Sequence, residues 1–230
     1  MVSTYSKDPT FVNAPIVDEH CLWQSAAHLY CNGPRMHEFL AEMNEEVLSK
    51  YDTMTVGECP ATPDLARVMQ YITAKQKQLN MVFQFDVVDL GTGAALKYGT
   101  IPKNFTLPDM KKAFGGTQGL LDGSDAWTTV FIKNHAQARS ISRFASDKRE
   151  HRVTSGKMLA MMLSTFSGTL YIYQGQEIGM INIPEDWPIE EYKDVESINH
   201  WNDVRARFGQ DAEKLQEARK ALQYLARDNG

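Results

Sequence analysis

Residues 127–144 constrain this chain more than any other stretch. Residues 127–132 form an apolar, β-branched run, which predicts a buried strand. The polar residues Asn134, His135, Gln137 and Arg139 follow directly, and a helix is expected after them. In parallel α/β architectures the chemistry sits at the carboxyl ends of the strands, so this pattern favours a functional site. A structural loop with a capping Asn fits the same residues, and the pattern alone leaves both interpretations open.

Three further strands are predicted at residues 53–58, 79–85 and 169–173. Helices are expected between them: one beginning near Pro34, one capped by residues 62–64, one opened by residues 106–109, and one at residues 155–166. Strands alternating with helices indicate parallel α/β structure. Four such units correspond to half of an eight-unit barrel of about 250 residues. We therefore predict a partial (half) TIM-type (β/α) barrel that forms a single domain over residues 1–230.

Two segments carry more specific structural predictions. Residues 155–166 are apolar on nearly all sides, which predicts a fully buried helix. A polar loop bearing Trp187 and Trp201 is expected to lead to a final helix from about Asp211.

Composition narrows the classes of partner and compartment. The chain has 230 residues, of which 43% are hydrophobic and 23% charged, as expected for a soluble domain with a sizeable core. A net charge of -5 gives no electrostatic reason to expect nucleic acid or an anionic membrane. Cys21, Cys31 and Cys59 are odd in number and lack metal-ligand spacing, which favours reduced thiols in a cytosol. Without a long apolar run or a signal-peptide core, we expect a cytoplasmic chain with no cofactor and no metal.

Residues 134–144 resemble the Asn-His-Asp-Gln-x-Arg-Ser-x-Ser-Arg-Phe segment of the glycoside hydrolase family 13 α-glucosidases, in the maltase and oligo-1,6-glucosidase branch. Further segments in the same order are similar to that family, at residues 31–38, 55–60, 79–85, 168–179 and 186–196. The family hydrolyses α-glucosidic bonds with retention, using one carboxylate as nucleophile and a second as acid/base about 5–5.5 Å away. A third carboxylate helps to bind the distorted sugar and to stabilise the transition state.

The resemblance assigns roles residue by residue. Glu58, in a Thr-Val-Gly-Glu segment, stands at the acid/base position, and His135 stands at the sugar-binding histidine. Ala136 occupies the position of the third carboxylate, where an alanine methyl group carries no charge and accepts no hydrogen bond. The remaining candidates for substrate binding are Phe85, Asn134, Gln137, Arg139 and Tyr173.

The nucleophile of the family lies in a Gly-Phe-Arg-x-Asp segment, which this sequence does not contain. Counting back from Tyr5-Ser6-Lys7, it would fall immediately before Met1. The resemblance thus implies a truncated protein that lacks the first half of the barrel, the inserted domain and the C-terminal β-domain. We expect such a chain to have no glycosidase activity.

Two alternatives from other classes stay open. The chain could be a repurposed enzyme of the isomerase, dehydratase or cyclase type, with Glu58 and His135 as an acid/base pair near Phe83, Phe85 and Tyr173. Glu58 would then be buried at a strand end with a raised pKa, whereas a solvated Glu58 would be an inherited residue without a role. The third class is a non-catalytic interaction protein.

The partner expected here is a small molecule or carbohydrate, with neither nucleic acid nor membrane. A half-barrel leaves open strand edges, at residues 53–57 and 169–173. It also leaves apolar residues such as Met81, Phe83 and Phe85 exposed. Both features predict a homo-oligomer, most simply a two-fold dimer.

Overall fold

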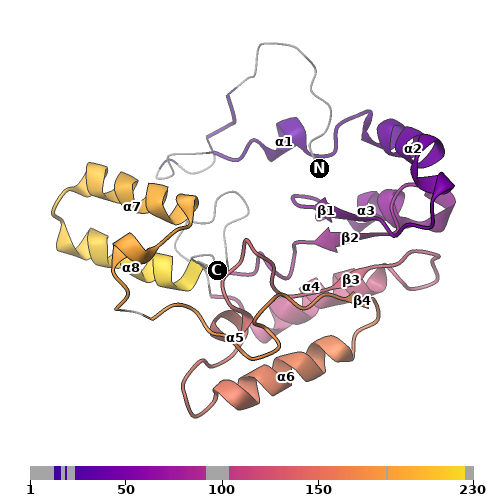
Figure 1. Ribbon diagram of the computed structural model, residues 1–230. Helices are drawn as coiled ribbons and strands as arrows, with labels where there is room; N and C mark the ends of the chain where they lie inside the picture. Colours follow the sequence, from indigo (N-terminus) through magenta and orange to yellow (C-terminus); the bar gives the residue numbers. More distant parts are fainter. Residues whose placement is uncertain (1–12, 17–18, 20–23, 92–103, 185, 226–230) are drawn as a thin grey trace. The chain divides into compact units, whose positions relative to one another are not determined.

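The computed structural model describes residues 13–16, 19, 24–91, 104–184 and 186–225. It divides into two compact units (Figure 1). The first unit comprises Met1–Val130 and Phe166–Tyr171, and the second comprises Phe131–Thr165 and Ile172–Gly230. The expectation of one domain stays a prediction.

All the strands among the described residues belong to the first unit. β1 (Val56–Cys59) pairs in parallel with β2 (Met81–Gln84), and β3 (Thr129–Val130) pairs in parallel with β4 (Thr169–Leu170) (Figure 1). Parallel strands separated by helices confirm an α/β fold. The predicted half-barrel of four consecutive strands is not seen, because the described residues form two separate two-stranded sheets.

Two helices of the first unit begin where their capping residues predict. Asp64 is the N-cap of α3 and its carboxylate accepts a hydrogen bond from the Ala66 amide at 2.9 Å. Thr106 and Asp109 form a reciprocal capping box at the start of α4. Both caps confirm the predicted helix starts. The helices are α1 (Ala27–Tyr30), α2 (Met36–Glu46), η1 (Leu48–Lys50), α3 (Leu65–Ile72), η2 (Ala74–Gln76) and α4 (Leu107–Gly119).

The core of the first unit forms between α3 and one face of the β1–β2 sheet. Side chains alternate across a strand, so Gly57 and Cys59 are buried on this face, whereas Val56 and Glu58 are exposed on the other. The buried cluster contains Met36, Leu40, Cys59, Val68, Tyr71, Ile72, Leu79, Val82, Leu120 and Ala126. This alternation decides where the predicted acid/base residue lies.

The apolar face of β2 is better covered than a half-barrel predicts. Met81 is only 4% exposed, and its sulfur accepts a hydrogen bond from the Tyr171 hydroxyl at 3.8 Å. The Phe83 ring meets the Tyr171 ring edge-on, with 4.7 Å between their centres. The predicted exposed patch is therefore wrong at Met81, because the chain after β4 covers it.

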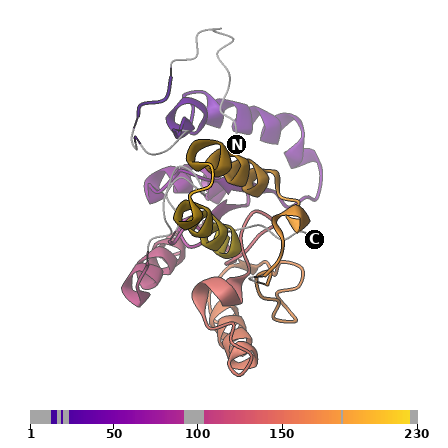
Figure 2. The same cartoon turned by 90° about the vertical axis from the view of Figure 1, so that its left-hand side faces the viewer.

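The second unit is helical in its described residues. α7 and α8 run side by side as a hairpin (Figures 1 and 2). Leu222 and Leu225 on α8 are buried, and the Arg219 guanidinium lies over the Trp201 ring of α7 at 5.4 Å. The helices are α5 (Ser140–Phe144), α6 (Arg152–Ser164), η3 (Ile189–Glu191), α7 (Val195–Phe208) and α8 (Ala212–Leu225). The final helix is confirmed, but the loop predicted before it contains α7.

The expectation of a fully buried α6 is wrong. Leu159 and Leu163 are each 3% exposed, but Val153 is 67% and Met161 66% exposed. α6, although apolar on nearly all sides, thus buries one apolar stripe and exposes another.

Candidate functional site

The polar segment after β3 is a tight loop built by its own side chains. Asn134 accepts a hydrogen bond from the Ala136 amide through Oδ1 at 2.8 Å, and its carbonyl accepts one from the Gln137 amide at 3.2 Å. An Asn side chain that bonds the backbone two residues ahead reproduces a backbone turn. Asn134 therefore sets the turn that presents His135 and Ala136.

A buried lysine holds this turn in place. Lys133 is 2% exposed, and its ammonium donates to the carbonyl of Gln137 at 2.5 Å and to that of Asn134 at 3.2 Å. The ammonium also lies 4.5 Å from the centre of the Tyr173 ring. Burying a lysine is favourable only when its charge is well solvated by the protein, and two carbonyls and an aromatic face supply that environment.

Arg139 ties the end of the loop to the segment after β4. It is 5% exposed, its Nη1 donates to the Gln174 carbonyl at 2.6 Å, and its guanidinium lies 5.8 Å from the Tyr173 ring centre. The Arg139 amide donates to Asn182 Oδ1 at 2.7 Å, and Asn182 Nδ2 donates to the Gln223 carbonyl of α8 at 2.9 Å. The loop is thereby fixed to α8 through one asparagine.

Gln137 is also held within the loop. Its Oε1 accepts a hydrogen bond at 3.2 Å from Nη1 of Arg143, a buried arginine of α5. His135, by contrast, is exposed, and Ala136 is half-buried. The loop therefore displays an imidazole and a methyl group on a scaffold made by its neighbours.

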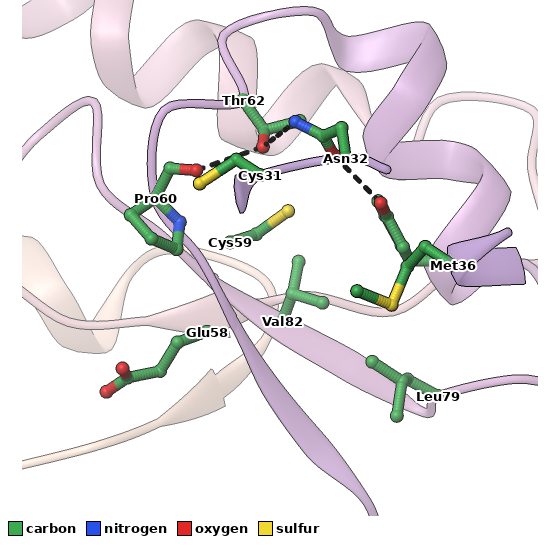
Figure 3. Close-up of a pocket in the computed structure, with 10 residues that line it drawn as sticks. Cys31, Asn32, Met36, Glu58, Cys59, Pro60, Thr62, Leu79 and Val82 are labelled. Atoms are coloured by element: carbon green, nitrogen blue, oxygen red, sulfur yellow. Dashed lines mark hydrogen bonds between the residues drawn. The ribbon is translucent and has the colours of Figure 1, made fainter. Parts of the chain in front are cut away.

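Glu58 lies on β1 in the first unit and is exposed. Of the two interpretations left open for Glu58, buried or solvated, the structure fits the solvated one, because Glu58 occupies the outward side of an alternating strand. Figure 3 shows its carboxylate pointing away from the small pocket beside it, whereas Cys59 turns its thiol inward. Glu58 pairs in register with Phe83 on β2, so both side chains lie on the same face of the sheet.

The pocket in Figure 3 is too small for a sugar. Its volume is about 20 Å³, room for roughly one water molecule. A hydrogen-bonded chain closes it: Tyr71 donates to Asn32 at 2.8 Å, Asn32 donates to Thr62 at 2.9 Å, and Thr62 donates to the Pro60 carbonyl at 3.1 Å. Burial raises the pKa of the Cys59 thiol and that of Cys31, which keeps both thiols protonated.

The candidate residues fall into both units. Asn134, His135, Ala136, Gln137, Arg139 and Tyr173 belong to the second unit, and Glu58 and Phe85 belong to the first. Lys133 and Asn182 also hold the loop, and the sequence interpretation missed both. The one signal for Lys133 was its position directly after an apolar strand, since a lysine is rarely buried unless its charge is paired.

The family model for the alpha amylase catalytic domain matches residues 1–230. The chain belongs to this family. The resemblance to glycoside hydrolase family 13 is thereby confirmed.

Its curated relatives are α-glucosidases and oligo-1,6-glucosidases. An α-glucosidase of Candida albicans is 45% identical over 228 residues, which cover 98% of this chain and 39% of that relative. An oligo-1,6-glucosidase of Saccharomyces cerevisiae is 37% identical over 231 residues, covering 99% of this chain and 38% of the relative. The chain thus spans about two fifths of the length of these relatives.

Solved structures agree with this assignment. A trehalose-6-phosphate hydrolase of Bacillus licheniformis superposes with a TM-score of 0.73 at 36% identity, over 86% of this chain and 35% of that one. An isomaltulose synthase of Erwinia rhapontici gives a TM-score of 0.70 at 32% identity, over 81% of this chain and 33% of that one. The family fold is therefore shared with enzymes that carry different names.

The described residues hold neither a membrane-spanning helix nor a cluster of metal ligands. No helix in them combines the length and hydropathy needed to cross a membrane. No group of three or more His, Cys, Asp or Glu side chains there is arranged to hold a metal ion. The absence of a cofactor and a cytoplasmic location stay predictions.

Proposed function

We propose that this chain is an α-glucosidase-like protein that does not hydrolyse α-glucosides. The observation that carries the proposal is Ala136, which stands where the family motif has its third carboxylate. Removing one member of a concerted catalytic set typically lowers kcat by about 10⁴–10⁶-fold. A methyl group offers neither the charge nor the hydrogen bond that a positively charged transition state requires.

The contacts within the loop indicate that it can lose the catalytic carboxylate and still keep its structure. The turn is made by Asn134, Lys133 and the backbone of Gln137, and the bond at residue 136 uses its backbone amide. The loop can therefore keep its shape with alanine at this position. Under the proposal, His135 and Arg139 remain as parts of a sugar-binding loop whose hydrolytic group is gone.

The test is an assay of glucose release by the purified 230-residue chain from maltose, isomaltose and an aryl α-glucoside. We expect none, and we expect Ala136→Asp to stay at background because these 230 residues contain no Gly-Phe-Arg-x-Asp segment. The matched aspartate-to-alanine change in the Candida albicans relative should lower its kcat by about 10⁴-fold or more. Turnover by the wild-type chain, expressed in a host without maltase, would overturn the proposal.

A second candidate is a non-catalytic interaction protein. The specific observation in its favour is β1, which pairs with β2 alone among the described strands and exposes Val56. A stable self-associated form that is unaffected by Glu58→Gln would support this candidate. No observation specifically favours the repurposed acid/base enzyme, since Glu58 and His135 lie in separate units.

A further inference from the structure

A groove of about 590 Å³ opens at the amino-terminal ends of the strands in the first unit. It is lined by the segment before β1, by the first residues of β2 and β4, and by the chain just before β3. The family's chemistry belongs to the opposite, carboxyl-terminal ends of the strands. The volume lies within the range of about 300–1,000 Å³ that is typical of small-molecule sites.

The floor of the groove is apolar and one wall is an indole ring. Ile72, Leu79 and Met81 form the floor and are 2%, 8% and 4% exposed. Trp127 lines the groove and is 46% exposed. Its Nε1 donates to the Thr169 hydroxyl at 2.8 Å. This bond fixes the orientation of the indole ring, of which nearly half stays exposed.

The rim of the groove is polar, and hydrogen bonds within the protein hold two of its side chains in place. Asn80 Oδ1 accepts from the amide and hydroxyl of Thr55 at 2.7 and 2.9 Å, and its Nδ2 group makes no hydrogen bond within the described residues. Asp125 Oδ1 accepts from the Ala74 amide at 3.2 Å, so its second oxygen stays available. The exposed Asp52 carboxylate makes no hydrogen bond or ion pair within the described residues. Donors and acceptors therefore surround an apolar floor.

We propose that this groove is a second, non-catalytic binding site for a saccharide. A pyranose ring has apolar faces and a hydroxyl edge. One face would stack on the Trp127 indole, and the hydroxyls would donate to Asp52 and Asp125 and accept from Asn80. An organic cation fits less well, because its ammonium would lose hydration over the apolar floor. This site goes beyond the proposed function and does not depend on it.

The experiment titrates the full chain with maltose and follows binding by calorimetry. We expect a dissociation constant on the order of 1 mM, which is typical of a shallow site. Trp127→Ala should weaken binding by about tenfold or more, whereas Trp127→Phe, which keeps an aromatic face, should stay within roughly threefold. Asp52→Asn should weaken binding by several-fold, because it removes a charge-assisted acceptor.

The control is Val153→Ala on α6, which removes an exposed apolar side chain outside the groove and should leave maltose affinity unchanged. Circular dichroism of each variant shows whether it is folded. Equal maltose affinity in wild type and folded Trp127→Ala, or no maltose binding at all, would overturn the inference. Tighter binding of putrescine than of maltose, lost in Asp52→Asn, would identify a cation site instead. The hydrolysis assay reads a different property, so the two proposals fail separately.

Discussion

At the scale of single residues, a loop can lose its reactive group and keep its geometry when other residues build it. Lys133 and Arg139 are almost fully buried and bond backbone carbonyls, so the loop depends on them more than on residue 136. Ala136 contributes its amide, which any residue except proline supplies. Under the proposed function a change at position 136 would alter chemistry, whereas a change at Lys133 should alter the fold of the loop.

Gly175 is the residue on which the Arg139 contact depends. Its φ of +86° favours glycine, and a Cβ at this position would meet Met180 Sδ and would lie 2.6 Å from Arg139 Nη1. We expect Gly175→Ala to lower the free energy of unfolding by about 2–4 kcal/mol, measured by urea denaturation.

Gly209 provides the matched control. Its φ is +59° and a Cβ there would meet no atom within 4 Å. Gly209→Ala should therefore cost less than Gly175→Ala, about 1–2 kcal/mol, from the backbone conformation alone. If the two variants lost the same free energy of unfolding, the close approach of residue 175 to Arg139 would not contribute to stability.

Asp86 gives stability a pH dependence of known sign. Burial raises the pKa of this half-buried carboxyl, so folding favours its protonated form. The stability that this group contributes is present below its unfolded pKa and is lost as the pH rises through the folded pKa. Asp86→Asn should raise the thermal midpoint at neutral pH, and the gain should vanish below about pH 3.9.

Asp109 serves as the control of opposite sign. Hydrogen bonds from the Thr106 hydroxyl and the Thr106 amide lower the pKa of its carboxyl. The stability that it contributes is present above its unfolded pKa and is lost as the pH falls through the folded pKa. Asp109→Asn should therefore lower the thermal midpoint at neutral pH and have no effect in strong acid. The same direction of change in both variants would contradict this account.

Residue-level prediction from sequence succeeded where chemistry is local and failed where burial is tertiary. The caps at Asp64 and Thr106 were readable because a cap needs only a side chain and the next three residues. The exposure of Glu58 was not readable, because it depends on which face of β1 the core covers. The burial of Lys133 was missed for the same reason, since its partners Gln137 and Tyr173 are assembled only by the fold.

At the scale of elements, helices were predicted better than strands, and the reasons differ. A helix closes its own hydrogen bonds, whereas the length of a strand depends on a partner elsewhere in the chain. The apolar run at residues 127–132 yields a strand of only two residues, β3, because pairing with β4 involves Thr129 and Val130 alone. α7 was missed because most of its residues are polar. Its signal was nevertheless present, since Ile198, Trp201 and Val204 recur at helical spacing after the capping residue Asp194.

The N-cap of α7 makes the next prediction. Asp194 accepts hydrogen bonds from the amides of Glu196 and Ser197 at 3.3 and 3.2 Å, and from the Ser197 hydroxyl. Asp194→Ala should reduce the free energy of unfolding by about 1 kcal/mol, whereas Asp194→Asn should stay within a few tenths because asparagine also caps. Urea denaturation followed by circular dichroism measures both. If the alanine variant were as stable as wild type, the Asp194 cap would not contribute to the stability of α7.

At the scale of the whole molecule, the chain holds the parallel strands of a family fold in which each sheet face and edge is normally covered. It spans about two fifths of its curated relatives, at 39% and 38% of their lengths. The described residues leave β1 with one paired edge, next to Met54 and Val56, which are 63% and 39% exposed. The unpaired edge of β1 and the exposed apolar side chains beside it therefore bear most directly on the oligomeric state.

We predict that the purified 230-residue chain forms a two-fold dimer through the outer edge of β1. An unpaired edge offers a row of backbone donors and acceptors to a second copy, and a two-fold axis pairs the two β1 strands antiparallel. Apolar area buried around Val56 and Met54 adds about 25 cal/mol per Å². Val56→Lys should convert the dimer to a monomer in sedimentation equilibrium, since a lysine at the edge costs desolvation of its charge. Met161→Lys, which removes an even more exposed apolar side chain from α6, should leave the dimer intact. A wild-type monomer at micromolar concentration would refute the prediction, and a dimer lost only in Met161→Lys would move the interface to α6.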